Sequence, residues 1–287
     1  MQRISISELS SVRWSFFQDV VRYAARGFNS LGVWRQKIDE FDELEALDLL
    51  SEMQMTVSSV HWAGGFTGHD GRSHVDAIDD ALDAIHLASR LNAGCLIVHP
   101  GCRNGHTTKH AHRLFATALQ TLLPVAEDYG VQLAIEPMPC PSASAWTFFR
   151  TFECSLRLLD EFCSDHLGLV LDLYHVGLNE QLFERLDSYV DRLALVQIAD
   201  RDSQPHVHEA RRNLGTGSVP ILRWLAELQQ LGYQGAFEVE LHGRALADQT
   251  YHSMLNHTAR FFQQPTVHSL LEVSSNSNIR VRRSSNQ

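Results

Sequence analysis

Residues 168–175, GLVLDLYH, decide the fold of this chain. Three apolar residues, Leu169–Leu171, run without a polar interruption and end at an acidic residue, Asp172. A strand that is apolar on both faces is typical of parallel sheets, in which helices cover each side. Because the burial of an unpaired charge is costly, a carboxylate at the end of such a strand indicates a paired or functional group.

The same arrangement recurs along the chain, with short apolar runs alternating with helical patterns. Apolar residues repeat at helical spacing within 75–85, 114–125 and 221–228. The predicted strands are Arg3–Glu8, Ser30–Trp34, Thr56–His61, Cys95–His99, Gln132–Glu136, Gly168–Asp172, Ala194–Ile198 and Ala236–Leu241.

Eight such units over about 262 residues favour an α/β fold of the (β/α)8 barrel type, which typically takes roughly 250 residues. A doubly wound open sheet is the alternative, but no G-x-G-x-x-G follows the first strand. We therefore predict a single barrel domain over residues 1–264. Residues 265–287 are polar and basic, and we expect them to form a disordered tail.

Composition and charge exclude several classes of protein. The chain has 287 residues, of which 44% are hydrophobic, and a formal net charge of -10. An acidic balance argues against nucleic acid or an anionic membrane as a partner. We find neither a secretory signal in Met1–Ser11 nor an apolar run near the roughly 20 residues of a membrane span. The five cysteines show no C-x-x-C pair, so we expect reduced thiols and a cytoplasmic location.

Polar residues stand at the ends of the predicted strands, where the active sites of such barrels lie. Three of them are carboxylates, which would repel one another unless a cation lay between them. Oxygen ligands suit Mg²⁺ or Mn²⁺, and an amide ligand is compatible with Mn²⁺. The sequence therefore predicts a metal site made of Glu136, Asp172, Gln197 and Glu240. Glu238 lies on the same strand face as Glu240, and we expect it one layer deeper and paired.

Further residues near the strand ends are candidates for substrate binding. Histidines could donate to sugar hydroxyls, an indole could stack on a sugar ring, and an arginine could reach a hydroxyl, carboxylate or phosphate. The alternatives are satisfied structural histidines, a core aromatic residue and a solvated basic turn. The candidates are His61, His99, His175, Arg211, Arg212 and Trp34. We interpret the other clustered histidines, His106, His110, His112, His206 and His208, as surface residues.

The order of several short motifs resembles that of the xylose isomerase-like barrel superfamily of sugar isomerases and epimerases. The resemblance runs from residue 1 to about residue 263 and rests on Ile135-Glu136-Pro137, Leu171–His175, Val196–Asp200, Leu214–Gly217 and Gly232–Glu240. It implies one divalent ion, most often Mn²⁺ with Mg²⁺ or Co²⁺ possible, on Glu136, Asp172, Gln197 and Glu240. The glutamine resembles the hydroxypyruvate isomerase branch, while the segment Met138–Trp146 lacks the acidic substrate contact of some epimerases. Relatives often assemble, so a homo-oligomer is possible.

The expected function is a metal-dependent sugar isomerase or epimerase. Glu136 and Glu240 would move a proton next to the carbonyl of a ketose or keto-sugar through an enediolate. Loss of a hydroxyl from the same intermediate would make the enzyme a dehydratase or lyase acting on a keto-sugar or keto-inositol. A nuclease of the endonuclease IV type and a non-catalytic sugar-binding barrel are the remaining alternatives.

Overall fold

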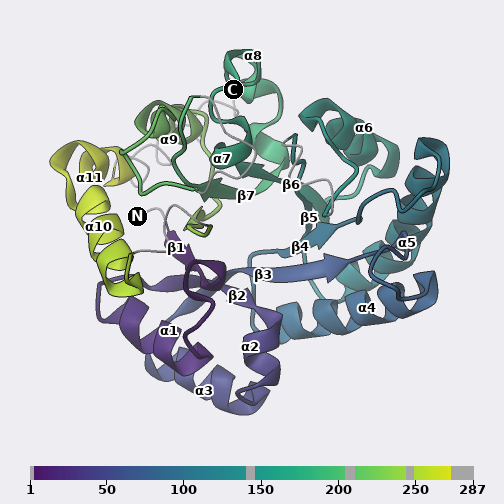
Figure 1. Cartoon of the computed structure of the whole chain (residues 1–287), viewed down its shortest axis with the longest axis horizontal. Coiled ribbons are helices and arrows are strands. Elements are labelled where there is room, and N and C mark those ends of the chain that lie inside the picture. The colour runs from purple at the N-terminus through teal and green to yellow at the C-terminus, as the bar shows by residue number, and fades with distance from the viewer. Residues whose placement is uncertain (1–2, 140–145, 204–210, 244–248, 273–287) are drawn as a thin grey trace, which may run out of the picture.

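Eight parallel strands close into a barrel in the order β1 to β8 (Figure 1). The computed structural model describes residues 3–139, 146–203, 211–243 and 249–272. Because β8 pairs with β1, the sheet has no open edge, which confirms the barrel and excludes the open sheet. The strands are β1 (Ile4–Ser7), β2 (Ser30–Trp34), β3 (Thr56–Gly64), β4 (Leu96–His99), β5 (Leu133–Ile135), β6 (Leu167–Asp172), β7 (Leu193–Ile198) and β8 (Phe237–Val239).

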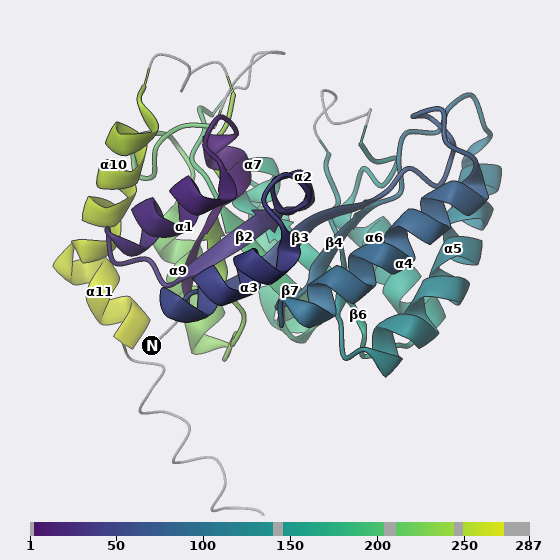
Figure 2. The same cartoon turned by 90° about the horizontal axis from the view of Figure 1, so that it is seen from below.

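Helices surround the barrel as an outer ring (Figures 1 and 2). The three helical patterns predicted from the sequence lie within α4, α5 and α9, and are confirmed. The helices are α1 (Phe16–Ala24), α2 (Arg35–Asp39), α3 (Glu43–Glu52), α4 (His74–Arg90), α5 (Thr108–Asp128), α6 (Phe152–Phe162), α7 (Leu173–Val176), α8 (Glu180–Phe183), α9 (Ile221–Gln230), α10 (Tyr251–Gln263) and α11 (Pro265–Glu272). No helix in the described part of the chain is long and apolar enough to cross a membrane.

Local sequence signals fix where the helices begin and end. Ser73 and Asp76 form a capping box at the start of α4, in which each side chain accepts a backbone N–H of the other. After α5 and α9 the chain turns at Gly130 and Gly232, whose φ angles are +66° and +85°. Glycine adopts this left-handed conformation at little cost, so each helix stops and the chain can enter the next strand.

Residues 265–272 differ from the sequence expectation. They form α11, whereas the sequence predicts a disordered tail from Pro265. Proline suits the first position of a helix, and Val267 and Leu271, four residues apart, are buried on one face. The apolar pair was too short a signal to outweigh the polar residues that follow. Residues 273–287, with the basic part of the expected tail, lie outside the described residues.

The strands carry two sets of side chains that face opposite ways. Residues such as Leu133, Ile135, Leu169 and Leu171 belong to the large core between the sheet and the helices. The alternate positions form a second, smaller cluster of Cys95, Ile97, Ala134, Val170, Leu195 and Ala236. Because side chains of a strand alternate, the next residue on this second face of each strand lies at the mouth of the barrel. The fold thereby determines which polar residues meet.

The cysteines of the described chain, Cys95, Cys102, Cys154 and Cys163, form no disulfide. This agrees with the expectation of reduced thiols. Cys140 lies outside the described residues.

Candidate active site

Four strand faces continue from the small cluster into the predicted metal ligands. Glu136 follows Ala134, Asp172 follows Val170, and Gln197 follows Leu195, each at a spacing of two. Glu240 follows Ala236 and Glu238 in the same way. All four predicted ligands are buried, with no more than 4% of each residue exposed. The structure therefore brings these polar groups together at the carboxyl ends of β5 to β8.

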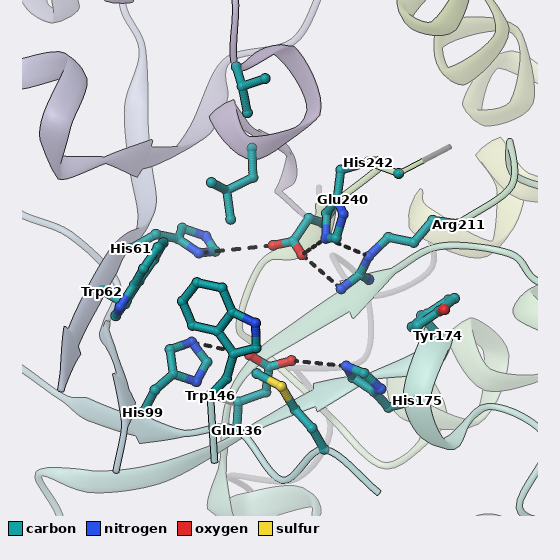
Figure 3. Close-up of a pocket in the computed structure, with 14 residues that line it drawn as sticks. His61, Trp62, His99, Glu136, Trp146, Tyr174, His175, Arg211, Glu240 and His242 are labelled. Carbon is teal, nitrogen blue, oxygen red and sulfur yellow. Dashed lines mark hydrogen bonds and ion pairs between the residues drawn. The ribbon is translucent and has the colours of Figure 1, made fainter. Parts of the chain in front are cut away.

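A cavity of about 360 Å³ opens above them (Figure 3). Two of the carboxylates, Glu136 and Glu240, line it directly. The rest of the lining combines apolar and aromatic side chains with histidines and one arginine: Leu9, Val12, His61, Trp62, His99, Met138, Trp146, Tyr174, His175, Arg211, His242 and Gly243. A concave space with apolar walls and a few convergent polar groups is typical of a small-molecule site.

Glu136 lies between two histidines. One of its oxygens is 3.6 Å from His99 Nε2, and the other is 3.7 Å from His175 Nε2. Burial, followed by the negative charges of Asp172 and Glu240, raises the pKa of Glu136 well above its ordinary value. Burial also lowers the pKa of His99 to about 3 and that of His175 to about 4. The carboxyl group of Glu136 thus has two neutral imidazoles for neighbours and holds a proton more readily than a free glutamate.

Arg211 connects two other carboxylates. Its Nη1 is 2.8 Å from Asp172 Oδ2, and its Nη2 is 2.8 Å from Glu240 Oε1. The guanidinium also lies 4.7 Å from the ring centroid of Tyr174. Burial alone would raise the pKa of Glu240, but Arg211, a hydrogen bond from His242 and the charge of His61 hold it well below its usual range. The pKa of Glu240 is therefore shifted in the opposite direction from that of Glu136.

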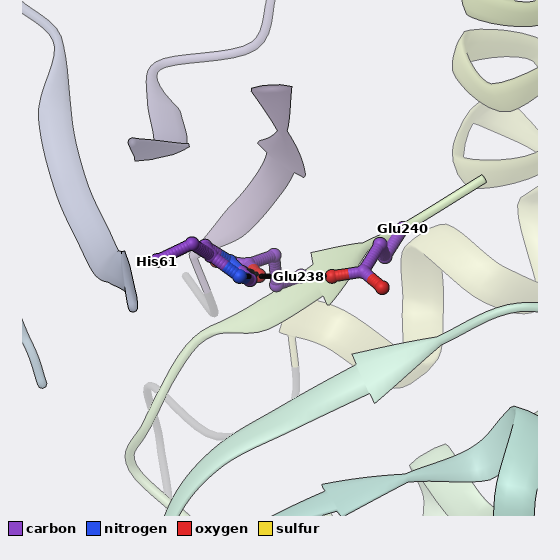
Figure 4. Close-up of side chains that lie close together, drawn as sticks. All are labelled: His61, Glu238 and Glu240. Carbon is purple, nitrogen blue, oxygen red and sulfur yellow. Dashed lines mark hydrogen bonds and ion pairs between the residues drawn. The ribbon is translucent and has the colours of Figure 1, made fainter. Parts of the chain in front are cut away.

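Glu238 lies one layer deeper and is fully buried, as the sequence predicts. Its Oε2 accepts hydrogen bonds from Ser58 Oγ at 2.7 Å and Ser59 Oγ at 2.5 Å. Its Oε1 accepts from His61 Nε2 at 3.0 Å (Figure 4). The same oxygen accepts from Gln197 Nε2 at 3.1 Å. Four donors explain why a buried carboxylate is tolerated here.

This network orients two residues of the site. Burial favours the neutral ring of His61, but the charge of Glu238 and their hydrogen bond outweigh it and raise the pKa of His61. The amide nitrogen of Gln197 donates to both Glu238 and Glu240, the latter at 2.8 Å. Both neighbours are acceptors, so the amide oxygen must face elsewhere, and this buried Oε1 has no hydrogen-bond partner among the described residues.

Within the part of the chain that the structure describes, two groups of side chains have the spacing of metal ligands. Glu136, Asp172 and His175 form one group, and His61, Glu238 and Glu240 form the other, with ligand atoms within 4.8 Å of one another in each. Because four donors already engage Glu238, the first group offers the less occupied oxygens. Arg211 connects one of its members, Asp172, to the carboxylate of Glu240.

The predicted substrate-binding residues divide into three sets. His61, His99, His175 and Arg211 line the cavity. Trp34 lines a neighbouring cavity instead. Arg212 points away from both, and its Nη2 pairs with Asp202 Oδ2 at 2.6 Å on the surface. The sequence could not separate the two adjacent arginines, because the chain geometry after β7 decides which one turns inward.

Several lining residues were not singled out from the sequence as part of the site. Tyr174 lies inside the motif Asp172–His175, and His242 follows Glu240 at the strand spacing of two, so both carried a usable signal. Met138 and Trp146 come from the loop after β5, where no periodicity shows which side chains point inward. His110 and His112 line a separate surface cavity between α5 and α6, while His206 and His208 lie outside the described residues.

Curated relatives match parts of the chain. An inosose isomerase from Halalkalibacterium halodurans is 26% identical over 183 residues, which cover 61% of this chain and 63% of that protein. A putative hydroxypyruvate isomerase from Streptomyces coelicolor is 26% identical over 238 residues, covering 74% of this chain and 80% of that protein. The match spans less than two thirds of the first relatives' own length.

Solved structures share the fold. The IOLI protein with a binding zinc atom superimposes with a TM-score of 0.79 at 16% identity, over 94% of this chain and 99% of that one. At this identity the likeness concerns the fold alone. The family model described as xylose isomerase-like TIM barrel matches residues 20–263. Together with the closed barrel and the acidic cluster at its mouth, this match shows that the chain belongs to the xylose isomerase-like TIM barrel family.

Proposed function

We propose that this protein is a sugar isomerase or epimerase that depends on a divalent metal ion. The observation that carries the proposal is the charge of the site. Four buried carboxylates, Glu136, Asp172, Glu238 and Glu240, face one guanidinium and one imidazole of raised pKa. If all six were ionised, two negative charges would remain in excess, which a divalent cation would offset. The names of the relatives, inosose isomerase and hydroxypyruvate isomerase, support this reaction class.

The residues present fit such an ion. Burial, followed by the negative charges of Asp172 and Glu240, raises the pKa of Glu136, and a cation beside this carboxyl group would favour its ionised form. The buried Gln197 Oε1 has no partner in the described chain and would supply an uncharged oxygen ligand. Glu136, Asp172, Gln197 and Glu240 would hold the ion, a donor set that suits Mn²⁺, with Mg²⁺ or Co²⁺ as alternatives. When bound, the ion supplies electrophilic stabilisation of the negative charge that develops on substrate oxygens.

Glu136 and Glu240 carry the proton chemistry in this proposal. Both line the cavity, and their environments separate their pKa values in opposite directions. One of the two would remove a proton from the carbon next to a carbonyl, and the other would return one. Return to the opposite face of the same carbon gives an epimer, and return to the neighbouring carbon gives an isomer.

Other side chains orient the substrate and its charge. Arg211 holds Glu240 and Asp172 in place through two contacts of 2.8 Å, and its charge lowers the pKa of Glu240. The buried imidazoles of His99 and His175, whose pKa values are lowered, remain neutral and can exchange hydrogen bonds with hydroxyls. Trp62 and Trp146 offer ring faces for the apolar side of a sugar.

The test monitors hydrogen exchange into the substrate by NMR. The full chain with Mn²⁺ is incubated in deuterated water with a panel of ketoses and oxidised sugars, and deuterium at the carbon next to the carbonyl is measured. We expect exchange by the wild type and a loss of about 10²- to 10⁴-fold in Glu136→Gln, the range typical of a lost acid–base group. Glu153→Gln on α6, an exposed pair of Arg185 remote from the cavity, is the matched control and should retain exchange. No exchange by the wild type on any substrate, or full exchange by Glu136→Gln, would contradict the proposal.

A further inference from the structure

A second cavity of about 360 Å³ adjoins the first, over the ends of β2 and β3. Four side chains line both spaces: His61, Trp62, His99 and Trp146. They lie on one side of the first cavity, opposite Arg211 and Tyr174 (Figure 3). A ligand that fills the first cavity could therefore extend past these shared side chains into the second.

The side chains that line both cavities are aromatic. The rings of Trp62 and Trp146 meet edge to face, with centroids 4.9 Å apart and planes at 88°. His99 stands beside them, with its centroid 6.0 Å from that of Trp62. Trp34, at the end of β2, adds a third indole to the second cavity. Indole faces suit the C–H face of a sugar ring, which is apolar although the ring edge is polar.

The charged groups of the second cavity are paired with one another. Asp80 accepts from Arg35 at 2.9 Å and lies 3.0 Å from Arg72, which also pairs with Asp70 at 2.7 Å. The guanidinium of Arg35 further donates to the carbonyl of Trp62, and that of Arg72 to the carbonyl of Gly64. Both cations are thus compensated before any ligand arrives, which disfavours a phosphate or carboxylate as the occupant.

The backbone is shaped to hold this paired network. Gly65 has a φ of +86°, and a Cβ there would come within 2.4 Å of Asp70 Oδ2 and 2.8 Å of an Arg72 nitrogen. The positive φ favours glycine at this position, and the missing side chain leaves room for the ion pair to pack against the backbone. At the rim, Gln36 and Asp39 on α2 are exposed and available as hydrogen-bonding groups for hydroxyls.

We infer that the substrate carries a second, uncharged sugar ring, so that this enzyme acts on a keto-glycoside of two rings. The reacting ring lies over Glu136 and Glu240, and the second ring lies between Trp34 and the shared indoles, with its hydroxyls toward the paired charges and Asp39. This inference rests on the proposed function for the reacting ring, but it concerns binding in the second cavity.

The test measures binding by the full chain without turnover. The probes are methyl glucoside, a set of glucose disaccharides of different linkage, and glucose 6-phosphate, each titrated by calorimetry. We expect at least one disaccharide to bind about tenfold more tightly than methyl glucoside, a difference of about 1.4 kcal/mol. Trp34→Ala should remove most of that preference. Asp39→Asn, an exposed change that leaves the fold intact, should reduce it, while the neighbouring control Glu40→Gln should keep it.

The outcomes separate this inference from the proposed function. Equal binding of methyl glucoside and every disaccharide, no sugar binding at all, or tightest binding of glucose 6-phosphate would each overturn the second-ring site. A preference unchanged in both Trp34→Ala and Asp39→Asn would also overturn it. Hydrogen exchange on a single-ring substrate together with any of these results would leave the proposed function standing. A preference for a disaccharide without hydrogen exchange on any substrate would support the second-ring site and contradict the proposed function.

Discussion

Arg211 is the residue on which the charge balance of the mouth depends most. It contacts Asp172 and Glu240 at 2.8 Å each, and only 4% of the residue is exposed. Removing one partner of a buried ion pair leaves an uncompensated charge, whereas exposed pairs contribute little. The same side chain would compete with the proposed metal ion for these two carboxylates, so we expect its effect on stability to depend on metal.

We therefore predict that Arg211→Met lowers the free energy of unfolding by about 3–5 kcal/mol without metal, the usual loss for a broken buried pair. Excess Mn²⁺ should restore part of that loss, because a cation can compensate the carboxylates. Chemical denaturation with and without Mn²⁺ measures both effects. The control is Arg223→Met, which breaks an exposed pair with Glu180 and should cost less than about 1 kcal/mol. Equal losses in the two variants would refute the role given to Arg211.

The positions of the four proposed ligands at the barrel mouth were more predictable than the contacts that these residues make. Glu136, Asp172, Gln197 and Glu240 follow strand periodicity, so the sequence indicates that they face the mouth. The contact of Arg211 with two of them joins segments that are far apart in the chain, and no local pattern encodes it. Its neighbour Arg212 has the same chemistry but pairs with Asp202 at the surface.

Sequence periodicity predicts the long helices of this protein but not the short ones. The strands and the long helices α4, α5 and α9 repeat their apolar residues several times, so these elements can be predicted from the sequence. The short helix α11 offers two buried residues, Val267 and Leu271, beside polar neighbours. Its packing against α9 and α10 is a tertiary contact, and such contacts override weak local signals.

From this packing we predict that a chain ending at residue 264 is less stable than one ending at residue 272. Loss of Val267 and Leu271 removes two fully buried aliphatic side chains, each contributing about 1.5–3 kcal/mol. Thermal unfolding of the two truncated chains compares them directly, with the full chain as reference. Matching unfolding temperatures for the three proteins would show that α11 does not stabilise the barrel.

A pH-dependent contact joins the start of α2 to α4. Burial would raise the pKa of Asp80, but hydrogen bonds and charge from Arg35, followed by those from Arg72, lower it below its ordinary value. A carboxylate whose folded pKa is depressed stabilises the protein above its unfolded pKa, which is about 3.9, and loses that contribution as the pH falls below it.

The free energy of unfolding of the wild type should therefore exceed that of Asp80→Asn at pH 6, and the gap should shrink from about pH 4 downward. Urea denaturation of both proteins across this range tests the sign. A gap that stays constant or widens with acid would contradict the assignment of this ion pair.

At the scale of the whole molecule, closure of the barrel brings polar residues that are far apart in the sequence to one candidate site. Each acidic residue stands alone in the sequence, between 136 and 240, and any one of them could be an ordinary paired charge. Closure of eight parallel strands brings their carboxyl ends to one rim, so the groups meet although about a hundred residues separate the first from the last. The fold was therefore the necessary step in predicting the site, and the eight-fold alternation made that step possible.

The central claim is that this rim binds one divalent cation through Glu136, Asp172, Gln197 and Glu240. Titration of the metal-free full chain with Mn²⁺ by calorimetry tests it most directly, with Asp172→Asn as the variant and Asp202→Asn, at an exposed ion pair, as the control. The account predicts one ion per chain for the wild type and the control, and affinity reduced at least about 100-fold in Asp172→Asn. No binding by the wild type, or equal affinity in all three proteins, would contradict it.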